Sequence, residues 1–292
     1  MTLEQLRIFV GVAEREHMTR AAAALNVTQS AASAAIAALE ARHAVSLFHR
    51  VGRRIELTEA GRVLLDEARA ILGRAASAEQ ALAEFNGLQR GTLKLIASQT
   101  IAGYWLPRHL AAFRARYPAI AIELAIANTG VAAQRVLEGA AELGFVEGSI
   151  VDPALAHWAV AEDRMMLVAA PGTETAFLID DDWLRSARWI MREPGSGTRS
   201  TLEEALGARG IDPATLDIAL TLPSNEAVRA AVEAGAGVAM LSALVVLRAL
   251  RAGTLAELSF ALPPRPFFGL RHKQRYRSRA ADALLALIEE VS

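Results

Sequence analysis

Residues 18–47, MTRAAAALNVTQSAASAAIAALEARHAVSL, constrain the fold of this chain more than any other segment. Small and apolar side chains predict a first helix from Thr19 to about Leu25, and Asn26-Val27 predicts a tight turn after it. Thr28 stands where a second helix needs its N-cap, because its side-chain oxygen can accept from the free backbone N–H groups of the first turn. The segment therefore predicts two short helices joined by a polar turn.

The second predicted helix has two different faces. Ala32, Ile36 and Leu39 recur at the spacing of a buried face, whereas Gln29 and Ser33 share another face four residues apart. A helix of this kind fits the major groove of DNA. The candidate DNA-reading residues are Thr28, Gln29, Ser30 and Ser33. The alternative is an alanine-rich helical hairpin that is only part of a helical bundle.

A short β-hairpin with a basic turn is predicted after the helical pair. Residues 47–58, LFHRVGRRIELT, run from apolar residues through a glycine-containing turn to the alternating pair Ile55 and Leu57. Basic side chains beside the groove can neutralise phosphates, and the candidates at the hairpin tip are Arg50, Arg53 and Arg54. The chain as a whole has a formal net charge of -1, so affinity for DNA must come from a local patch.

Taken together, about the first 65 positions resemble the winged helix-turn-helix of the LysR-type transcriptional regulators. The resemblance has no gap, and it is carried by Leu3, Leu6, Phe9, Ala13, Glu14, Thr19, Ala21, Ala22, Leu25, Gln29, Ser30, Ser33, Ile36, Leu39, Glu40, Leu47, Phe48, Arg50, Leu57, Thr58 and Gly61. His17-Met18 departs from the family pattern of a Ser or Asn followed by an aromatic residue, which we interpret as a tolerated change in helix packing. The rest of the chain resembles the effector-binding domain of the same family, with looser motifs.

Residues 59–85 predict one uninterrupted helix with an apolar heptad seam. The seam consists of Leu64, Ala68, Ile71, Ala75, Ala78, Leu82 and Phe85. Two such helices can pair, and a dimer would place two recognition helices on successive faces of the duplex. The alternative is a long helix that lies on its own domain. The helix is expected to end at Asn86-Gly87, and a hinge is expected at residues 89–91.

Strands and helices alternate from Thr92 onward. The expected strands are 92–97, 120–127, 142–146, 164–170, 188–191, 217–221, 238–241 and 267–271, and the expected helices are 101–117, 131–137, 200–208, 226–234, 243–250 and 278–291. This order is typical of an α/β fold with parallel pairing and helices on both faces of the sheet.

Three domains are expected from this organisation. They are a winged helix-turn-helix at 1–58, a linker or dimerisation helix at 59–88 and an effector-binding domain at 89–292. Two crossovers would divide the last of these into subdomain I (about 91–161 and 267–292) and subdomain II (about 162–266), with a cleft between them. The family resemblance implies the same architecture, like that of periplasmic solute-binding proteins.

Three polar segments follow predicted strands and precede predicted helices. Ligands of open α/β sheets collect at such positions, where helix N-termini direct backbone N–H groups inward. The candidate effector-binding residues are Ser98, Gln99, Thr100, Asn128, Thr129, Glu147, Arg192, Gly195, Ser196, Gly197 and Thr198. This set of donors favours an anion, either a carboxylate or an oxyanion such as sulfate or phosphate.

The third polar segment, REPGSGTR at 192–199, resembles an RE-x-GSGTR motif found in part of the LysR family. Members that carry it include regulators of carbon fixation and of sulfur assimilation. The alternatives are that residues 195–198 form only a capped strand-to-helix turn, that Glu193 pairs with an arginine, and that Arg199 lies on an outer helix face. For Glu147 the alternative to a place at the cleft is a solvated strand end.

Catalytic and metal-binding patterns are poor by comparison. The chain has no Cys, its six His show no ligand spacing on one element, and no GxSxG, HExxH or P-loop is present. We therefore expect no enzyme activity, no cofactor and no metal. Charged residues interrupt the apolar N-terminal stretch, which argues against a signal peptide, and the longest uncharged apolar run, 234–247, is too short to span a bilayer.

The sequence therefore predicts a cytoplasmic transcriptional regulator of the LysR type. The expected partners are double-stranded promoter DNA, a small anionic effector and further copies of the chain, with RNA polymerase as a candidate and no membrane. The heptad seam predicts a dimer, and the family resemblance implies a tetramer. Effector binding would change the closure of the cleft and thereby the placement of the DNA-binding heads. The rival functions are a solute-binding transport component and an enzyme built on the α/β part.

Overall fold

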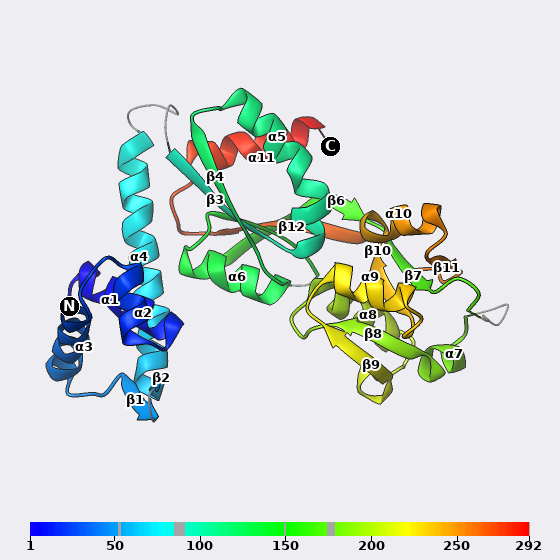
Figure 1. Cartoon of the computed structure of the whole chain (residues 1–292). Coiled ribbons are helices and arrows are strands. Elements are labelled where there is room, and N and C mark those ends of the chain that lie inside the picture. The colour runs from blue at the N-terminus through cyan, green and yellow to red at the C-terminus, as the bar shows by residue number, and fades with distance from the viewer. Residues whose placement is uncertain (52–53, 85–90, 149, 174–178, 292) are drawn as a thin grey trace. The chain divides into compact units, whose positions relative to one another are not determined.

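The computed structural model describes residues 1–51, 54–84, 91–148, 150–173 and 179–291. The chain divides into two compact units, Met1–Phe85 with Leu137–Ala140, and Asn86–Val136 with Ala141–Ser292. The first unit is mainly helical, and the second is mixed α/β (Figure 1). The predicted end of the seam at Phe85, the helix end at Asn86-Gly87 and the first hinge residues lie outside the described residues, as does Arg53.

Helices and one β-hairpin form the described part of residues 1–85. They are α1 (Leu3–Arg15), α2 (Met18–Ala24), α3 (Gln29–His43), β1 (Phe48–Val51), β2 (Arg54–Leu57) and α4 (Glu59–Glu84). Oγ1 of Thr28 accepts from the backbone N–H of Ala31 at 3.1 Å, which confirms the predicted N-cap of α3. Nδ1 of His17 accepts from the backbone N–H of Arg20 at 3.4 Å and caps α2. The histidine that departs from the family pattern therefore has a capping role.

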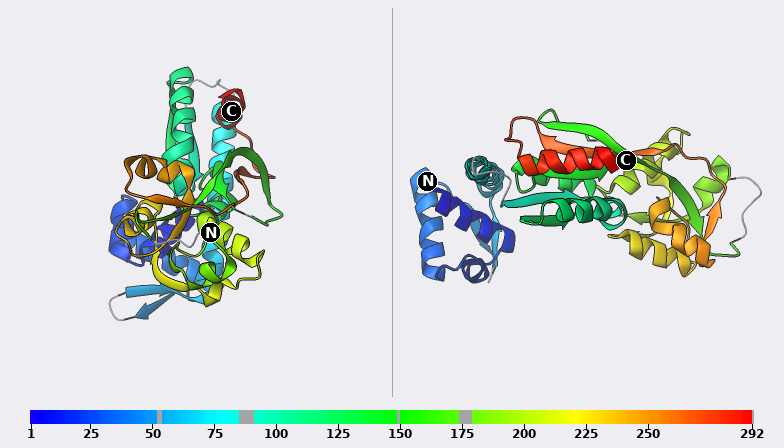
Figure 2. Two further views of the ribbon diagram at one scale, coloured as in Figure 1. Left: turned by 90° about the vertical axis from the view of Figure 1, so that its right-hand side faces the viewer. Right: turned by 90° about the horizontal axis from the view of Figure 1, so that it is seen from above.

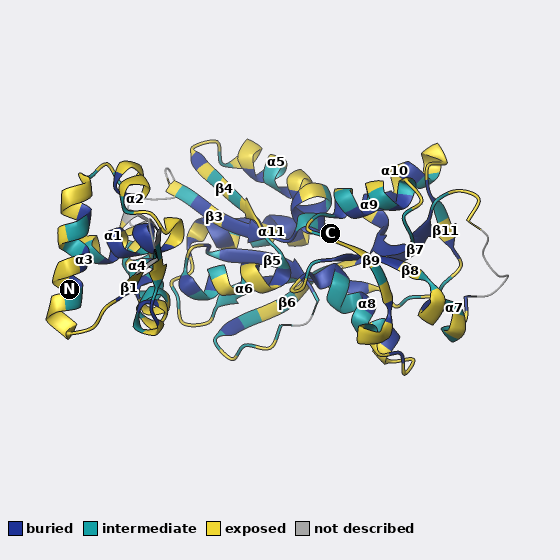
Figure 3. Cartoon of the chain, turned by 60° about the horizontal axis from the view of Figure 1, so that its bottom comes forward, coloured by how far each residue is buried: buried dark blue, intermediate teal, exposed yellow. Residues whose placement is uncertain are grey.

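The buried face of α3 is the one that its residue spacing predicts. Ala32, Ile36 and Leu39 are at most 5% exposed and share a core with Phe9 and Val12 of α1. Burial of each larger aliphatic side chain contributes about 1.5–3 kcal/mol relative to exposure. The opposite face of α3 is exposed (Figure 3), so packing fixes the helix while leaving one side free for a partner.

No single helix among the described residues is long and apolar enough to cross a membrane. By length and composition alone, α2 and α3 together would meet the criterion for a bent membrane-spanning pair, with an angle of 109° between them. Both helices contribute buried side chains to the core of their unit, among them Ala21, Ala22 and Ile36.

The long helix α4 uses its apolar seam in two ways. Ala68 is fully buried, and it packs with the partly buried Leu64 and Ile71 in the core shared with α1. Further along, Ala78 is exposed and Leu82 is 70% exposed. The first part of the seam therefore covers the helix-turn-helix, whereas Ala78 and Leu82 are uncovered in the single chain.

The junction between β2 and α4 requires a glycine. A Cβ atom at Gly61 would lie 2.1 Å from the backbone oxygen of Leu47, far inside van der Waals contact. Thr58 completes this turn, because its Oγ1 donates to the backbone oxygen of Ser46 at 2.7 Å and accepts from the backbone N–H of Gly61 at 2.9 Å. The hairpin is thus tied directly to the start of α4.

The second unit contains a five-stranded sheet with helices on both faces, which we call the first lobe. Its strands, in spatial order, are β4 (Ile120–Ile126), β3 (Gly91–Ala97), β5 (Leu143–Glu147), β12 (Arg265–His272) and β6 (Leu155–Asp163). β3 is parallel to β4 and β5, as predicted, but β12 is antiparallel to both β5 and β6. The expectation of parallel pairing is therefore wrong on this side of the sheet, because the chain returns from the rest of the unit in the opposite direction. The strand β6 is not among the predicted strands.

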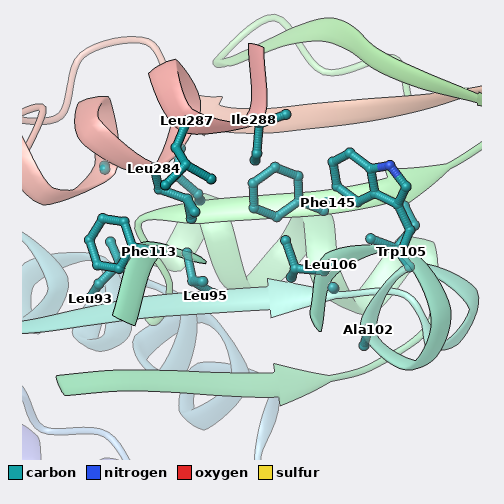
Figure 4. Close-up of a cluster of buried hydrophobic side chains, with 14 of the residues drawn as sticks. Leu93, Leu95, Ala102, Trp105, Leu106, Phe113, Phe145, Leu284, Leu287 and Ile288 are labelled. Carbon is teal, nitrogen blue, oxygen red and sulfur yellow. The ribbon is translucent and has the colours of Figure 1, made fainter. Parts of the chain in front are cut away.

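Helices α5 (Leu106–Arg116) and α11 (Arg279–Val291) lie side by side on one face of this sheet (Figure 1, Figure 2). Leu95 and Phe145 point toward them and pack with Trp105 and Leu284 (Figure 4). A short π-helix, η1 (Ile101–Trp105), precedes α5, where the sequence predicts one continuous helix. On the other face lies α6 (Thr129–Glu138).

The rest of the second unit forms what we call the second lobe. Its strands are β7 (Met165–Ala169), β8 (Arg188–Arg192), β9 (Asp217–Leu222), β10 (Ala239–Ser242) and β11 (Ala256–Leu258), and its helices are α7 (Asp181–Ser186), α8 (Gly197–Gly207), the 3-10 turn η2 (Pro213–Thr215), α9 (Asn225–Glu233) and α10 (Ala243–Ala252). β8 and β9 are parallel, whereas β10 and β11 pair antiparallel with β7, which again differs from the expected parallel pairing. α7 and β11 are too short for the sequence pattern to predict.

His109 on α5 gives the fold a predicted pH dependence. It is fully buried beside Trp105, and its Nε2 accepts from Nε of Arg108 at 3.1 Å. Burial and the adjacent Arg108 charge lower the pKa of His109 below its ordinary value of 6.5. In acid the unfolded chain therefore binds a proton that the folded chain excludes, so the stability contributed by neutral His109 is complete above pH 6.5 and falls as the pH drops below it.

We expect His109→Gln to lose this part of the pH dependence. The measurement is urea unfolding of the full chain between neutral and mildly acidic pH, with the exposed His157→Gln as the matched control. An unchanged pH profile in His109→Gln would contradict the assignment.

Candidate effector and DNA-binding sites

Ser98, Gln99 and Thr100 follow β3 at the edge where the first lobe meets the second. Ser98 is 3% exposed and Thr100 is fully buried. The backbone N–H of Ser98 donates to the backbone oxygen of Phe145 at 2.9 Å. Among the described residues no group forms a hydrogen bond with Oγ of Ser98. A buried hydroxyl without a protein partner is a group that a bound polar ligand can satisfy.

Asn225, at the start of α9, joins the two lobes and was missed by the sequence analysis. Its Nδ2 donates to Oγ1 of Thr100 at 3.0 Å, and its backbone N–H donates to Oε1 of Gln99 at 3.0 Å. Its Oδ1 accepts from Nη1 of Arg192. The available signal was Ser224, whose side chain caps α9 directly after β9, in the same strand-to-helix arrangement as the three predicted segments.

Arg192 is 4% exposed and is held by the residue that follows it. Its Nε and Nη2 donate to the two carboxylate oxygens of Glu193 at 2.8 and 3.0 Å. Burial raises the pKa of Glu193, but hydrogen bonds from Arg192 and Asn128 and the charge of Arg192 outweigh it and lower the pKa overall. The structure therefore shows Glu193 paired with an arginine, which is one of the alternatives that the sequence left open.

The glycines of the third segment allow close backbone contact. Gly195 has φ +85° and its backbone oxygen accepts from the N–H of Gly130 at 3.2 Å. A Cβ atom at Gly197 would lie 2.2 Å from the backbone oxygen of Glu147 and 2.7 Å from Oγ1 of Thr129. Oγ1 of Thr129 donates to that same Glu147 oxygen at 2.7 Å. The end of β5 and the segments that follow β4 and β8 therefore meet at one point.

The first turn of α8 lies at this meeting point. Gly197 and Thr198 belong to the helix, so α8 begins three residues earlier than predicted. Ser196 is its N-cap residue and is 3% exposed, but its side chain makes no capping hydrogen bond. The first-turn N–H groups of a helix lack intrahelical acceptors and carry a partial positive charge, which makes this end a donor to anions.

A buried cluster of charges lies next to the site. Nη2 of Arg265 is 2.5 Å from Oδ2 of Asp163, and Nη1 is 3.8 Å from Oε1 of Glu147 and 3.3 Å from Oγ1 of Thr198. Glu147 is 2% exposed. It therefore does not lie at a solvated strand end, which was the alternative to a place at the cleft. Sequence reasoning missed Arg265 and Asp163, because neither follows a predicted parallel strand.

Arg199 does not join the donors of the site. Its Nε donates to Glu203 at 2.7 Å along α8, and its Nη1 donates to the backbone oxygen of Arg192 at 3.2 Å. The structure brings the predicted effector-binding residues together, and Asn225 joins them. The predicted residues are Ser98, Gln99, Thr100, Asn128, Thr129, Glu147, Arg192, Gly195, Ser196, Gly197 and Thr198.

The exposed face of α3 carries few polar groups. Thr28, Gln29 and Ser30 are exposed, and Ser33 is half-buried. Nε2 of Gln29 donates to Oγ of Ser33 at 3.3 Å, and the hydroxyls of Thr28 and Ser30 lie 3.0 Å apart. These side chains share one end of the helix, as the sequence predicts.

The hairpin after α3 is present with a defined register. Arg50 pairs with Ile55 and Val51 pairs with Arg54 across the antiparallel strands. Both arginine positions thus lie next to the turn, and the turn residue Arg53 lies outside the described residues.

Comparison with known proteins assigns both parts of the chain to one family. Residues 3–62 match the bacterial regulatory helix-turn-helix protein of the lysR family, and residues 86–292 match the LysR substrate binding domain. The chain is 36% identical over 288 residues to the uncharacterized HTH-type transcriptional regulator YeiE of Escherichia coli K12, covering 98% of this chain and 96% of that protein. It is 33% identical to a probable RuBisCO transcriptional regulator of Trichormus variabilis, covering 97% and 86%.

Solved structures share the fold of this chain, one of them over its full length. CbnR complexed with its target DNA has a TM-score of 0.69 at 23% identity and covers all of both chains. The regulatory domain of Synechocystis CcmR in complex with 2-PG has a TM-score of 0.63 at 24% identity, covering 69% of this chain and 97% of that one. The chain belongs to the LysR family of transcriptional regulators, with an N-terminal helix-turn-helix and a C-terminal effector-binding domain.

Proposed function

We propose that this regulator binds double-stranded promoter DNA through α3 and the β1–β2 hairpin, and that a small anion bound between the two lobes modulates this binding. The proposed DNA-contacting residues are Thr28, Gln29, Ser30, Ser33, Arg50, Arg53 and Arg54. The likeness to CbnR, which is complexed with its target DNA, supports the first part of the proposal. The complex of CcmR with 2-PG supports the second part.

The observation that carries the anion proposal is the unpaired hydroxyl of Ser98 among buried donors. Ser98, Thr100, Ser196 and Thr198 are each at most 3% exposed, and they come from both lobes. The start of α8 adds backbone N–H groups and the positive end of its dipole. An anion that accepted from these groups would satisfy the Ser98 hydroxyl and contact both lobes at once.

The charge of Arg192 contributes indirectly in this proposal. Glu193 already neutralises its guanidinium, and Arg192 in turn holds Asn225. The hydrogen bonds from Asn225 to Gln99 and Thr100 then connect the lobes. Binding of the anion would stabilise one arrangement of the lobes, and the equilibrium between arrangements would pass this preference to the DNA-binding heads.

A thermal-shift screen of the full chain tests the anion proposal. The panel is sulfate, phosphate, succinate and 2-PG, and a ligand that binds only the folded state raises its stability by RT ln(1 + [L]/Kd). We expect one anion to raise the melting temperature, and we expect Ser98→Ala to remove that increase, because alanine loses the hydroxyl donor without adding volume at this buried position. An increase that persists in full in Ser98→Ala would place the anion elsewhere. No increase with any member of the panel would reject this anion class.

We also propose that the chain forms a dimer through α4. We propose that such dimers form a tetramer, because the family resemblance implies one. The exposed part of the seam, around Ala78 and Leu82, is the proposed contact. We expect Leu82→Asp to weaken the dimer at least about tenfold, since a buried unpaired charge costs well over 1.4 kcal/mol. Sedimentation velocity measures the change, and Glu79→Asp at a neighbouring exposed position is the control. A dimer of unchanged affinity in Leu82→Asp would contradict pairing through this seam.

A further inference from the structure

Tyr104 reaches from the first lobe to the second. It belongs to η1, whose residues Ile101 and Trp105 are buried in the core of the first lobe. The Tyr104 side chain instead packs against a core cluster of the second lobe, which includes Met166 of β7 and Val228 of α9. One side chain of η1 therefore packs on the core of the other lobe.

The hydroxyl of Tyr104 forms a hydrogen bond between the lobes. It donates to Oε1 of Glu226, in the first turn of α9, at 3.0 Å. Burial and the hydrogen bond to Glu226 raise the pKa of Tyr104 above its ordinary value of 10, so the hydroxyl keeps the proton that it donates. Hydrogen bonds to a carboxylate are stronger than those between neutral groups. The second lobe thus holds Tyr104 by its ring and by its hydroxyl.

Two further hydrogen bonds join the same two segments. Nε2 of Gln99 donates to the backbone oxygen of Pro223 at 3.0 Å, and Oε1 of Gln99 accepts from the backbone N–H of Asn225 at 3.0 Å. Residues 99–104 of the first lobe and 223–226 of the second therefore form one continuous contact, which we call the latch.

The chain crosses between the lobes at two other places. β6 passes into β7 through Arg164 alone, and residues 259–264 lead from β11 back to β12. Asp163 ends β6 and Arg265 begins β12, and these two residues form the buried ion pair described above. Oγ of Ser242 in the second lobe also donates to Asp163 at 2.8 Å. Breaking a buried ion pair is strongly destabilising, so the crossovers are the fixed part of the connection.

The strand order places the latch at a distance from these crossovers. β3, which leads into the latch, is separated from β12 by β5, and hence by two strand spacings of about 4.8 Å each. A rotation of the lobes about the crossovers would therefore separate the groups of the latch while moving Asp163 and Arg265 little. The latch is the contact that such a rotation has to break.

We infer that the latch holds the two lobes together in the chain without a ligand, with Tyr104 as its anchor and the Asp163–Arg265 pair as the pivot about which the lobes open. This inference does not rest on the anion proposal, because it concerns the equilibrium between joined and open lobes before any anion binds. Tyr104 and Glu226 are not among the proposed effector-binding residues, so changing them removes no donor from that site.

Amide hydrogen exchange of the full chain, resolved to single residues, tests the latch. Exchange of a protected amide requires its hydrogen bond to open, so the rate reports the open fraction. The backbone N–H of Asn225 donates across the lobes within the latch. The backbone N–H of Gly130 donates across the lobes outside it, to the oxygen of Gly195 at 3.2 Å. The buffer is free of sulfate, phosphate and carboxylates, so the outcome is separate from that of the anion screen.

Tyr104→Phe keeps the ring and removes only the hydroxyl. We expect it to accelerate exchange at Asn225 and Gly130 by the same factor, at least about threefold, because one rotation of the lobes opens both bonds. Glu226→Ala removes the acceptor of the same hydrogen bond and should accelerate both amides similarly. The double variant should be no faster than the faster single variant, since the two changes remove one interaction.

Reference amides and a control variant accompany these measurements. The N–H of Ser98 donates within the first lobe and the N–H of Ile190 within the second, so both should exchange at wild-type rates. Tyr117→Phe removes the hydroxyl of the tyrosine that follows the last turn of α5, in the first lobe. It should leave the cross-lobe and reference amides unchanged.

The inference is overturned if Tyr104→Phe leaves Asn225 and Gly130 at their wild-type rates. Acceleration at Asn225 alone would also overturn it, because that result indicates local fraying of α9 without opening of the lobes. Equal acceleration at the reference amides would overturn it as well, because that result indicates a general loss of stability.

Discussion

Gly197→Ala is expected to abolish the anion response, whereas Gly207→Ala, in the same helix, should leave it intact. At Gly197 the new Cβ would lie 2.2 Å from the Glu147 oxygen and 2.7 Å from Oγ1 of Thr129. The first turn of α8 must then move away from β5, which separates the donors that the anion needs. Overpacking of this kind typically costs about 1–3 kcal/mol of stability.

The control substitution has the opposite physical effect. A Cβ atom at Gly207 meets no atom within 4 Å, and alanine is the better helix former by about 0.8–1 kcal/mol. Gly207→Ala should therefore be as stable as the wild type or more so. Urea unfolding and the thermal shift with the anion measure the two effects. Equal anion shifts in both variants would show that the close contact at Gly197 has no part in the site.

Ser33→Arg is expected to reduce sequence-specific DNA binding at least about tenfold, because it replaces a small hydroxyl in the proposed base-reading face with a long charged side chain. Ser33 shares that face with Gln29, whose Nε2 donates to its Oγ at 3.3 Å. The readout is the ratio of affinities for a DNA site selected by the wild type from a random pool and for a scrambled site.

Ala38→Arg is the matched control for this change. It adds the same charge to the same helix at an exposed position, about 140° around the helix axis from Ser33. Both variants gain the same general attraction to phosphates, so only the loss of specificity separates them. Equal affinity ratios in Ser33→Arg and the wild type would contradict the assignment of α3 as the recognition helix.

The helix-turn-helix was predictable because its signals are local. The cap at Thr28 and the spacing of Ala32, Ile36 and Leu39 each depend on neighbouring residues, and the structure confirms both. The capping role of His17 was harder to predict, because histidine is an uncommon N-cap residue and its role depends on the turn before α2.

The effector site was predictable only in part, because several of its groups meet through long-range contacts. Asn225 bonds to Thr100 across 125 positions, and Arg265 bonds to Asp163 across 102. The antiparallel direction of β12, which carries Arg265, also depends on the returning chain and leaves no local pattern. Strand ends followed by helix starts were informative, and the Ser224 cap shows that the same signal extended to α9.

The most direct test of the account is a reciprocal measurement of DNA and anion binding on the wild-type chain. Affinity for the selected DNA site is measured with and without the anion that gives the largest thermal shift, and affinity for that anion is measured with and without the DNA. Coupled binding requires that each ligand change the affinity of the other by the same factor, typically about 5–150-fold. We predict equal factors within this range. A factor of one in both directions would contradict the proposal that an anion between the lobes modulates DNA binding.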